Sequence, residues 1–153
     1  MNLAHLSDQE IKETLVLKER LELLKNQAKC QDSFLEYVKY MWPEFICGRH
    51  HKIFAQKLED VAKGKINRLI VNMPPRHTKS EFCSTYFPAW IMGKQPNRKI
   101  MQTTHTGELA VRFGRKVRNM MDTDEYKRIF DKVELQADSK SAGRWETNKG
   151  GEY

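Results

Sequence analysis

Residues 68–80 read RLIVNMPPRHTKS, and this stretch decides the expected fold. It begins with a short apolar run of residues that favour strands, and two adjacent prolines end the run. A continuous apolar run of this length is typical of a strand that is buried on both faces, as in a parallel sheet. We therefore expect a strand over 68–73, a loop after it, and a helix that begins at Lys79.

The segment that follows completes a strand–helix–strand unit. A helix is expected from Lys79 to about Met92, kinked or interrupted by Pro88, which lacks a backbone N–H. After a turn, residues 99–104 read KIMQTT and are expected to form a second strand. This order of elements is a βαβ unit, which is nearly always right-handed. The sequence thus predicts an α/β fold with a parallel sheet.

Helices are predicted on both sides of this unit. A capping box of Ser7 and Glu10 indicates the start of a long amphipathic helix, and we assign residues 1–32 to this N-terminal segment. Further helices are expected over 33–41, 51–62 and 107–121, and a short one from Thr123 to Phe130. Residues 148–151 (NKGG) signal a turn, which would begin a hairpin that has no returning strand.

The loop before Lys79 has the position and the side chains of a phosphate-binding loop. Where a strand gives way to a helix, the first helical amides are unpaired and the helix dipole favours an anion. Lys79 could reach the β- and γ-phosphates of a nucleotide, and the Ser80 hydroxyl could ligate Mg²⁺. Met73 and Thr78 replace the two glycines of the usual pattern. On the pattern alone, an ordinary turn with exposed lysine and arginine stays the alternative.

The positive charge is concentrated in one part of the chain. The 153 residues carry a net charge of +7, and residues 94–118 account for +6 of it, with seven basic residues and one acidic residue. Such a segment suits a polyanion, either nucleic acid or nucleotide phosphates, and a solvated helix face is the alternative. Arg112, Arg115 and Arg118 form one stripe of it, which we consider for contact with DNA or a neighbouring subunit.

Composition excludes several other classes of protein. The chain is 39% hydrophobic and 31% charged, a balance typical of a globular domain. No apolar stretch approaches the length of a membrane span, the N-terminus is unlike a signal peptide, and three cysteines do not make a disulfide framework. A reducing, cytoplasmic setting fits these features.

Over about residues 33–153 the sequence resembles the large terminase subunits of tailed bacteriophages. Residues 72–80 are similar to the glycine-poor Walker A loop of that family, which commonly reads MPPRHGKS. Residues 42–45 and 48–51 resemble the segment that leads into the adenine pocket. The similarity continues through residues 103–105, 109–110, 113–118, Tyr126 with Phe130, 145–147 and 150–153.

The resemblance implies a P-loop NTPase-type three-layer fold with a parallel central sheet, preceded by the N-terminal helical segment. Residues 33–153 would be the first part of the ATPase domain, ending before the acidic Walker B strand and without the nuclease domain. The implied activity is that of a viral DNA-packaging motor, which couples ATP hydrolysis to translocation of double-stranded DNA into a procapsid. ATP and Mg²⁺ are the implied cofactors. The portal protein, the small terminase subunit and a homo-oligomeric ring are the implied partners, in the host cell cytoplasm.

The resemblance also assigns roles to single residues. Lys79 and Arg76 would be catalytic, since the Arg76 guanidinium could reach the γ-phosphate. The implied nucleotide-binding residues are Pro75, Arg76, His77, Thr78, Lys79, Ser80, Glu81, His51 and Gln56, and Ser80 would hold Mg²⁺ together with ATP. A threonine at position 78, where the family usually has glycine, predicts weaker nucleotide binding.

Two further function classes stay open. An apolar strand that ends in two acidic residues is missing from the sequence, so we expect an N-terminal fragment that binds nucleotide weakly and hydrolyses little. The alternatives are another P-loop NTPase (a helicase or a nucleotide kinase) and a basic nucleic-acid-binding or assembly domain without a nucleotide. A zinc site at Cys47, His50 and His51 lacks a fourth ligand at the required spacing.

Overall fold

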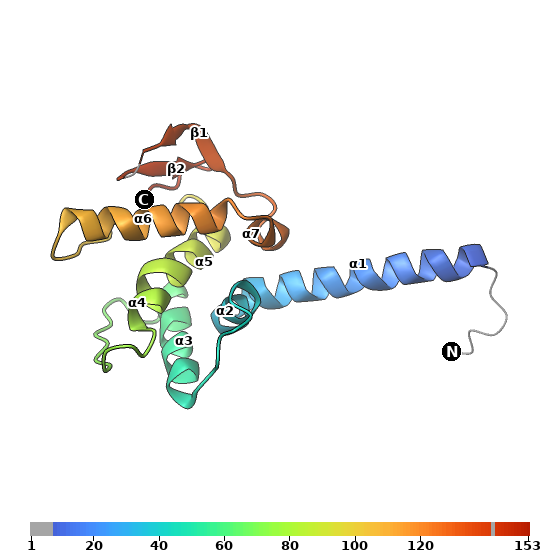
Figure 1. Cartoon of the computed structure of the whole chain (residues 1–153), viewed down its shortest axis with the longest axis horizontal. Helices are drawn as coiled ribbons and strands as arrows, with labels where there is room; N and C mark the ends of the chain where they lie inside the picture. Colours follow the sequence, from blue (N-terminus) through green and yellow to red (C-terminus); the bar gives the residue numbers. More distant parts are fainter. Residues whose placement is uncertain (1–7, 142) are drawn as a thin grey trace.

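The computed structural model describes residues 8–141 and 143–153, and Figure 1 shows a group of short helices from which one long helix projects. The described residues are mostly helical, and they include two short strands. The helices are α1 (Asp8–Asp32), α2 (Phe34–Met41), α3 (Arg49–Ala62), α4 (Lys79–Glu81), the π-helical turn η2 (Phe82–Tyr86), α5 (Phe87–Lys94), α6 (Gly107–Met121) and α7 (Asp124–Ile129). The strands are β1 (Leu135–Lys140) and β2 (Trp145–Thr147).

The long helix α1 joins the rest of the protein through its last turns (Figure 1). There, the side-chain amides of Gln27 and Gln31 donate to the Ile129 carbonyl of α7, at 3.1 and 2.5 Å. Six of its large apolar side chains before these turns are 52–67% exposed, namely Leu15, Val16, Leu17, Leu21, Leu23 and Leu24. The predicted helix is therefore present, but most of its apolar side chains are not covered by the rest of the protein. Ser7, the predicted capping residue, lies outside the described residues.

An aromatic cluster around α2 forms the core. The sequence places apolar residues of α2 one turn apart, and Phe34, Tyr37 and Val38 are fully buried. The Phe34 ring meets the rings of Phe82 and Trp90 edge to face, each at 5.5 Å. This cluster holds α2 against the helix that starts at Lys79. It therefore fixes the position of the helix that directly follows the predicted phosphate loop.

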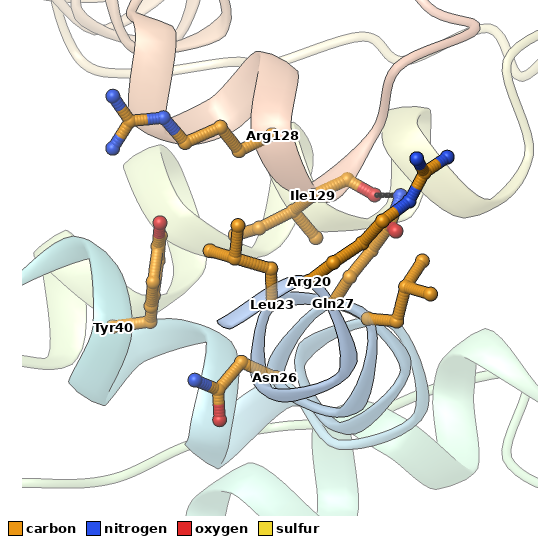
Figure 2. Close-up of a pocket in the computed structure, with 8 residues that line it drawn as sticks. Arg20, Leu23, Asn26, Gln27, Tyr40, Arg128 and Ile129 are labelled. Atoms are coloured by element: carbon orange, nitrogen blue, oxygen red, sulfur yellow. Dashed lines mark hydrogen bonds between the residues drawn. The ribbon is translucent and has the colours of Figure 1, made fainter. Parts of the chain in front are cut away.

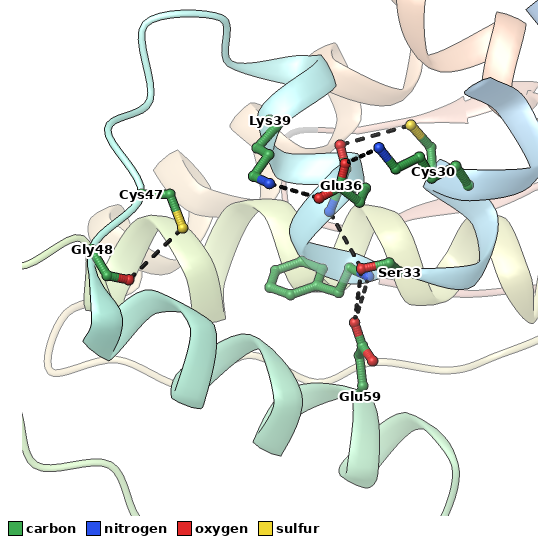
Figure 3. Close-up of polar contacts among 9 residues, drawn as sticks. Cys30, Ser33, Glu36, Lys39, Cys47, Gly48 and Glu59 are labelled. Atoms are coloured by element: carbon green, nitrogen blue, oxygen red, sulfur yellow. Dashed lines mark hydrogen bonds and ion pairs between the residues drawn. The ribbon is translucent and has the colours of Figure 1, made fainter. Parts of the chain in front are cut away.

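Polar contacts tie the first three helices together (Figure 3). The carboxylate of Glu59 in α3 accepts hydrogen bonds from the Phe34 amide (2.8 Å) and the Ser33 hydroxyl (3.3 Å), so it caps α2. Glu36 is paired with Lys29 and Lys39, each at 2.7 Å, and these hydrogen bonds lower the pKa of its carboxyl group. These contacts orient α2 and α3 relative to each other.

The helix predicted from Lys79 to about Met92 is present and extends to Lys94 as α4, η2 and α5. Pro88 does not interrupt it. Instead, the turn before Pro88 widens, and the Phe87 amide donates to the Phe82 carbonyl in a π-type bond. A local change of register of this kind accommodates a residue that has no amide to donate. The helix that carries Lys79 is therefore continuous.

The expected parallel sheet is missing from the described residues, so the prediction of a P-loop NTPase-type three-layer fold is wrong. Residues 68–73 have alternately exposed and half-buried side chains, as in a strand with one covered face, but no described strand pairs with them. Of residues 99–104, only Lys99 pairs, in an isolated parallel bridge with Glu152. A strand forms only where a neighbour supplies the partner for its backbone groups, so the apolar run alone was insufficient.

The sheet that does form lies near the C-terminus. Strands β1 and β2 are antiparallel, and the pairing contains an irregularity between Leu135 and Lys140. The predicted turn after residue 147 is present, and no described strand follows it. The chain does pair back on β2 through an isolated antiparallel bridge between Glu146 and Glu152, where Tyr153 and Trp145 exchange backbone hydrogen bonds (3.0 and 3.1 Å). Figure 1 shows this sheet next to α6.

The other predicted helices are confirmed: the one over 107–121 has the predicted bounds, and the ends of the others differ by at most two residues. Ser33, Thr106 and Thr123 accept a hydrogen bond from a first-turn amide of α2, α6 and α7, respectively. In the part of the chain that the structure describes, no helix combines the length and the apolar character that a bilayer span requires.

Candidate functional site

The loop between residue 73 and α4 has an unusual backbone. Arg76 and Thr78 have φ angles of 62° and 59°, in the left-handed region that residues with a Cβ rarely adopt. Thr78 is followed directly by the right-handed residues of α4. A left-handed residue next to a right-handed one turns successive amides toward one side, which is the arrangement called a nest that binds anions.

The amides at the start of α4 are available for such an anion. The first helical hydrogen bond runs from the Phe82 amide to the Thr78 carbonyl (2.9 Å), so the amides of residues 79–81 lie ahead of it. Residues 73–81 line a cavity of about 450 Å³. The Lys79 ammonium group donates to the Met73 carbonyl across the loop, at 3.3 Å. A cation, free amides and a cavity are thus combined in one loop.

Of the remaining predicted loop residues, some are exposed to solvent and one forms an ion pair. Pro75, Arg76, His77 and Ser80 are exposed, and all of them line the cavity. The Glu81 carboxylate forms an ion pair with Lys116 of α6 at 2.8 Å. The hydroxyl of Ser80 is therefore accessible to a phosphate-bound cation, whereas the Glu81 carboxylate is paired with Lys116.

The structure brings His51 to the loop from α3. His51 is 6% exposed, and its Nε2 lies 2.8 Å from the Thr78 hydroxyl. The Gly48 amide donates to its Nδ1 at 2.9 Å, so the ring proton is on Nε2 and is donated to Thr78. The Thr78 hydroxyl in turn donates to the His77 carbonyl at 2.7 Å. Sequence reasoning named His51 but not this contact, because the two residues are 27 positions apart.

Three imidazole rings gather beside the loop. The ring centroid of His50 lies 3.8 Å from that of His51 and 5.6 Å from that of His77. Burial lowers the pKa of His51, and the neighbouring His50 and His77 lower it further. Within residues 8–141 and 143–153, no group of three or more histidine, cysteine, aspartate or glutamate side chains is placed to hold a metal ion.

The other predicted residues lie apart from this loop. Gln56 is exposed on α3 and does not line the cavity. Arg112 and Arg115 are exposed on α6, and Arg118 of the same helix is half-buried. Hence the structure associates His51 with the loop and leaves Gln56 and the arginine stripe elsewhere.

A second cavity, of about 460 Å³, lies between α1, α2 and α7 (Figure 2). No motif indicated it, because its walls come from three segments that are far apart in sequence. Its lining residues are Arg20, Leu23, Leu24, Asn26, Gln27, Tyr40, Arg128 and Ile129. The cavity thus combines two arginines with the apolar side chains of Leu23, Leu24 and Ile129.

The geometry of the loop over 73–81 allows it to bind an anion of phosphate type. Its amides and Lys79 supply the donors, and Ser80 supplies a hydroxyl ligand for a cation bound to the same anion. Comparison of the chain with known proteins found no matching family model, no similar curated protein and no similar solved structure.

Proposed function

We propose that the loop over residues 73–81 binds the phosphates of ATP together with Mg²⁺. The observation that carries the proposal is the left-handed backbone of Arg76 and Thr78 directly before the helix that begins at Lys79. This backbone is strained for residues with a Cβ, and strain of this kind concentrates at ligand-binding sites. The proposal concerns the loop and requires no parallel sheet.

Each residue of the loop has a separate role in the proposed site. The amides of residues 79–81 hold phosphate oxygens, and the Lys79 ammonium group leaves the Met73 carbonyl to neutralise the β- and γ-phosphates. The exposed Arg76 guanidinium approaches the γ-phosphate, where it stabilises charge during phosphoryl transfer. The Ser80 hydroxyl ligates Mg²⁺.

We propose further that the chain serves a viral DNA-packaging motor as its ATP-binding part. This second step is supported by the resemblance of residues 33–153 to large terminase subunits, and by the loop over 73–81 in particular. In the intact motor, hydrolysis would drive double-stranded DNA into a procapsid. The partners would be the portal protein, the small terminase subunit and further copies in a ring, in the host cell cytoplasm.

Calorimetric titration with Mg·ATP tests the first step. We expect saturable binding by the wild-type chain and its loss in Lys79→Ala, because the ammonium group is the proposed partner of the β- and γ-phosphates. Lys52→Ala removes an exposed lysine from α3 and serves as the matched control, with unchanged affinity. Absence of binding by the wild-type chain, or equal binding by Lys79→Ala, contradicts the proposal.

Nucleic-acid binding by α6 is the second candidate function, favoured by the exposure of Arg112 and Arg115 in the most basic segment of the chain. Titration with a DNA duplex at several salt concentrations separates it from the first. A steep fall of affinity with salt that Arg112→Ala and Arg115→Ala reduce, without any nucleotide dependence, indicates a DNA-binding module. Nucleotide binding that depends on Lys79 indicates the ATP site.

A further inference from the structure

Thr78 has a backbone conformation that its own side chain disfavours. It combines φ 59° with ψ 6°, and it is a β-branched residue, for which the left-handed region is a clear outlier. Its position decides the direction of the Lys79 and Ser80 amides, because it is the residue immediately before α4. Something other than local preference must therefore hold Thr78 in place.

The hydrogen bonds of the Thr78 hydroxyl supply this restraint. The hydroxyl accepts from His51 Nε2 at 2.8 Å and donates to the His77 carbonyl at 2.7 Å. The Gly48 amide, which donates to His51 Nδ1 at 2.9 Å, sets the tautomer that makes Nε2 the donor. A chain of three hydrogen bonds thus runs from the start of α3 to the loop.

The imidazole of His51 is itself held firmly. Its ring packs edge to face against Phe45 at 4.7 Å and lies 5.5 Å from the Phe82 ring. Phe82 belongs to the helix that begins at Lys79, so the ring of His51 rests on the same element whose first amides it helps to direct. The burial of this ring keeps the donor in one orientation.

We propose that His51 is the positioning residue of the loop over 73–81: by donating from Nε2 to the Thr78 hydroxyl, it holds Thr78 left-handed and aims the first amides of α4 at a bound phosphate. The inference rests on the proposed nucleotide site. It explains how a threonine keeps the left-handed conformation at position 78, which a glycine would adopt without a restraining hydrogen bond.

A double-mutant cycle measured with Mg·ATP tests the proposal. His51→Phe keeps an aromatic ring beside Phe45 and Phe82 but removes the donor, and Thr78→Gly removes both the acceptor and the backbone strain. In the wild-type background, His51→Phe is expected to weaken Mg·ATP binding about five- to tenfold, as for the loss of one hydrogen bond. In the Thr78→Gly background, the same change is expected to alter binding by less than about twofold.

His50→Phe is the matched control, because His50 is the exposed neighbour of His51 and is expected to leave affinity within about twofold. An equal loss from His51→Phe in both backgrounds shows a merely structural role and overturns the proposal.

A second measurement requires neither a variant nor a nucleotide. Nitrogen-15 NMR of the imidazole groups at neutral pH is expected to show His51 with a protonated Nε2 and an unprotonated Nδ1. The opposite tautomer overturns the proposal even if ATP binds. If the expected tautomer is found but Mg·ATP does not bind to the wild-type chain, the nucleotide site fails while the His51–Thr78 link stands.

Discussion

Residues 68–73 and the hairpin of β1 and β2 over 135–147 differ in a way that their sequences do not suggest. Residues 68–73 carry the stronger strand pattern, yet no described strand pairs with them, and Ile70 is 87% exposed. The hairpin alternates only weakly in sequence but forms the sheet, with Trp145 fully buried in it. The difference shows that a strand is decided by its partners and by what covers its face, more than by its own apolar content.

The largest effect is expected from Trp145→Ala in the hairpin. Trp145 is stacked on Tyr153 with ring centroids 5.0 Å apart, and its indole N–H donates to the Gly114 carbonyl of α6 at 3.2 Å. Truncation leaves a cavity and removes this hydrogen bond, so we expect a loss of about 3–5 kcal/mol in the free energy of unfolding. Urea denaturation measures it. A loss below about 1 kcal/mol would mean that the hairpin is not anchored to α6.

Gly151→Ala is expected to cost less, about 2 kcal/mol or more. A Cβ at this position would lie 2.3 Å from the Pro96 carbonyl oxygen and 3.0 Å from that of Arg98, so the backbone on one side must move. Gly107→Ala is the matched control, because a Cβ there meets nothing within 4 Å and lies in the first turn of α6. Thermal unfolding of both variants compares them. A similar melting temperature for the two would contradict the close approach.

The pH dependence of stability is expected to come from His51 in α3, the helix that precedes residues 68–73. Burial lowers the pKa of His51 below its usual value of about 6.5, so the unfolded chain takes up a proton that the folded chain resists. Stability is therefore complete above that pH and falls as the pH drops towards the lower pKa of the folded state. Urea denaturation between neutral and mildly acidic pH measures the slope, and His51→Phe should flatten it. An unchanged slope in that variant would assign the effect to another group.

The smallest effect is expected from Ile70→Ala in the unpaired segment. The side chain is 87% exposed, so its truncation should change the free energy of unfolding by less than about 0.5 kcal/mol. The same urea titration as for Trp145→Ala sharpens the contrast between the two regions. A loss comparable with that of a buried isoleucine would show that residues 68–73 are covered in solution by something that the structure does not contain.

The helices could be predicted from the sequence, and so could the position of the candidate loop. Ser33, Thr106 and Thr123 mark helix starts through contacts within one turn, and Lys79 stands at the start of a helix as expected. The parallel sheet was predicted wrongly because residues 68–73 were assigned a partner that the described residues do not supply. At Pro88, a π-type turn replaces the expected break, and no local rule distinguishes the two.

The sequence by itself determined the helices, their caps, and a loop that brings Lys79 and Ser80 to a helix start. Hydrogen bonds in these features join residues within about four positions, so local chemistry is enough to specify them. Only the tertiary structure decided which strands pair, that Trp145 packs on α6, and that His51 reaches Thr78. These contacts join residues far apart in the chain, and they exist only after the aromatic core has placed the helices that carry them.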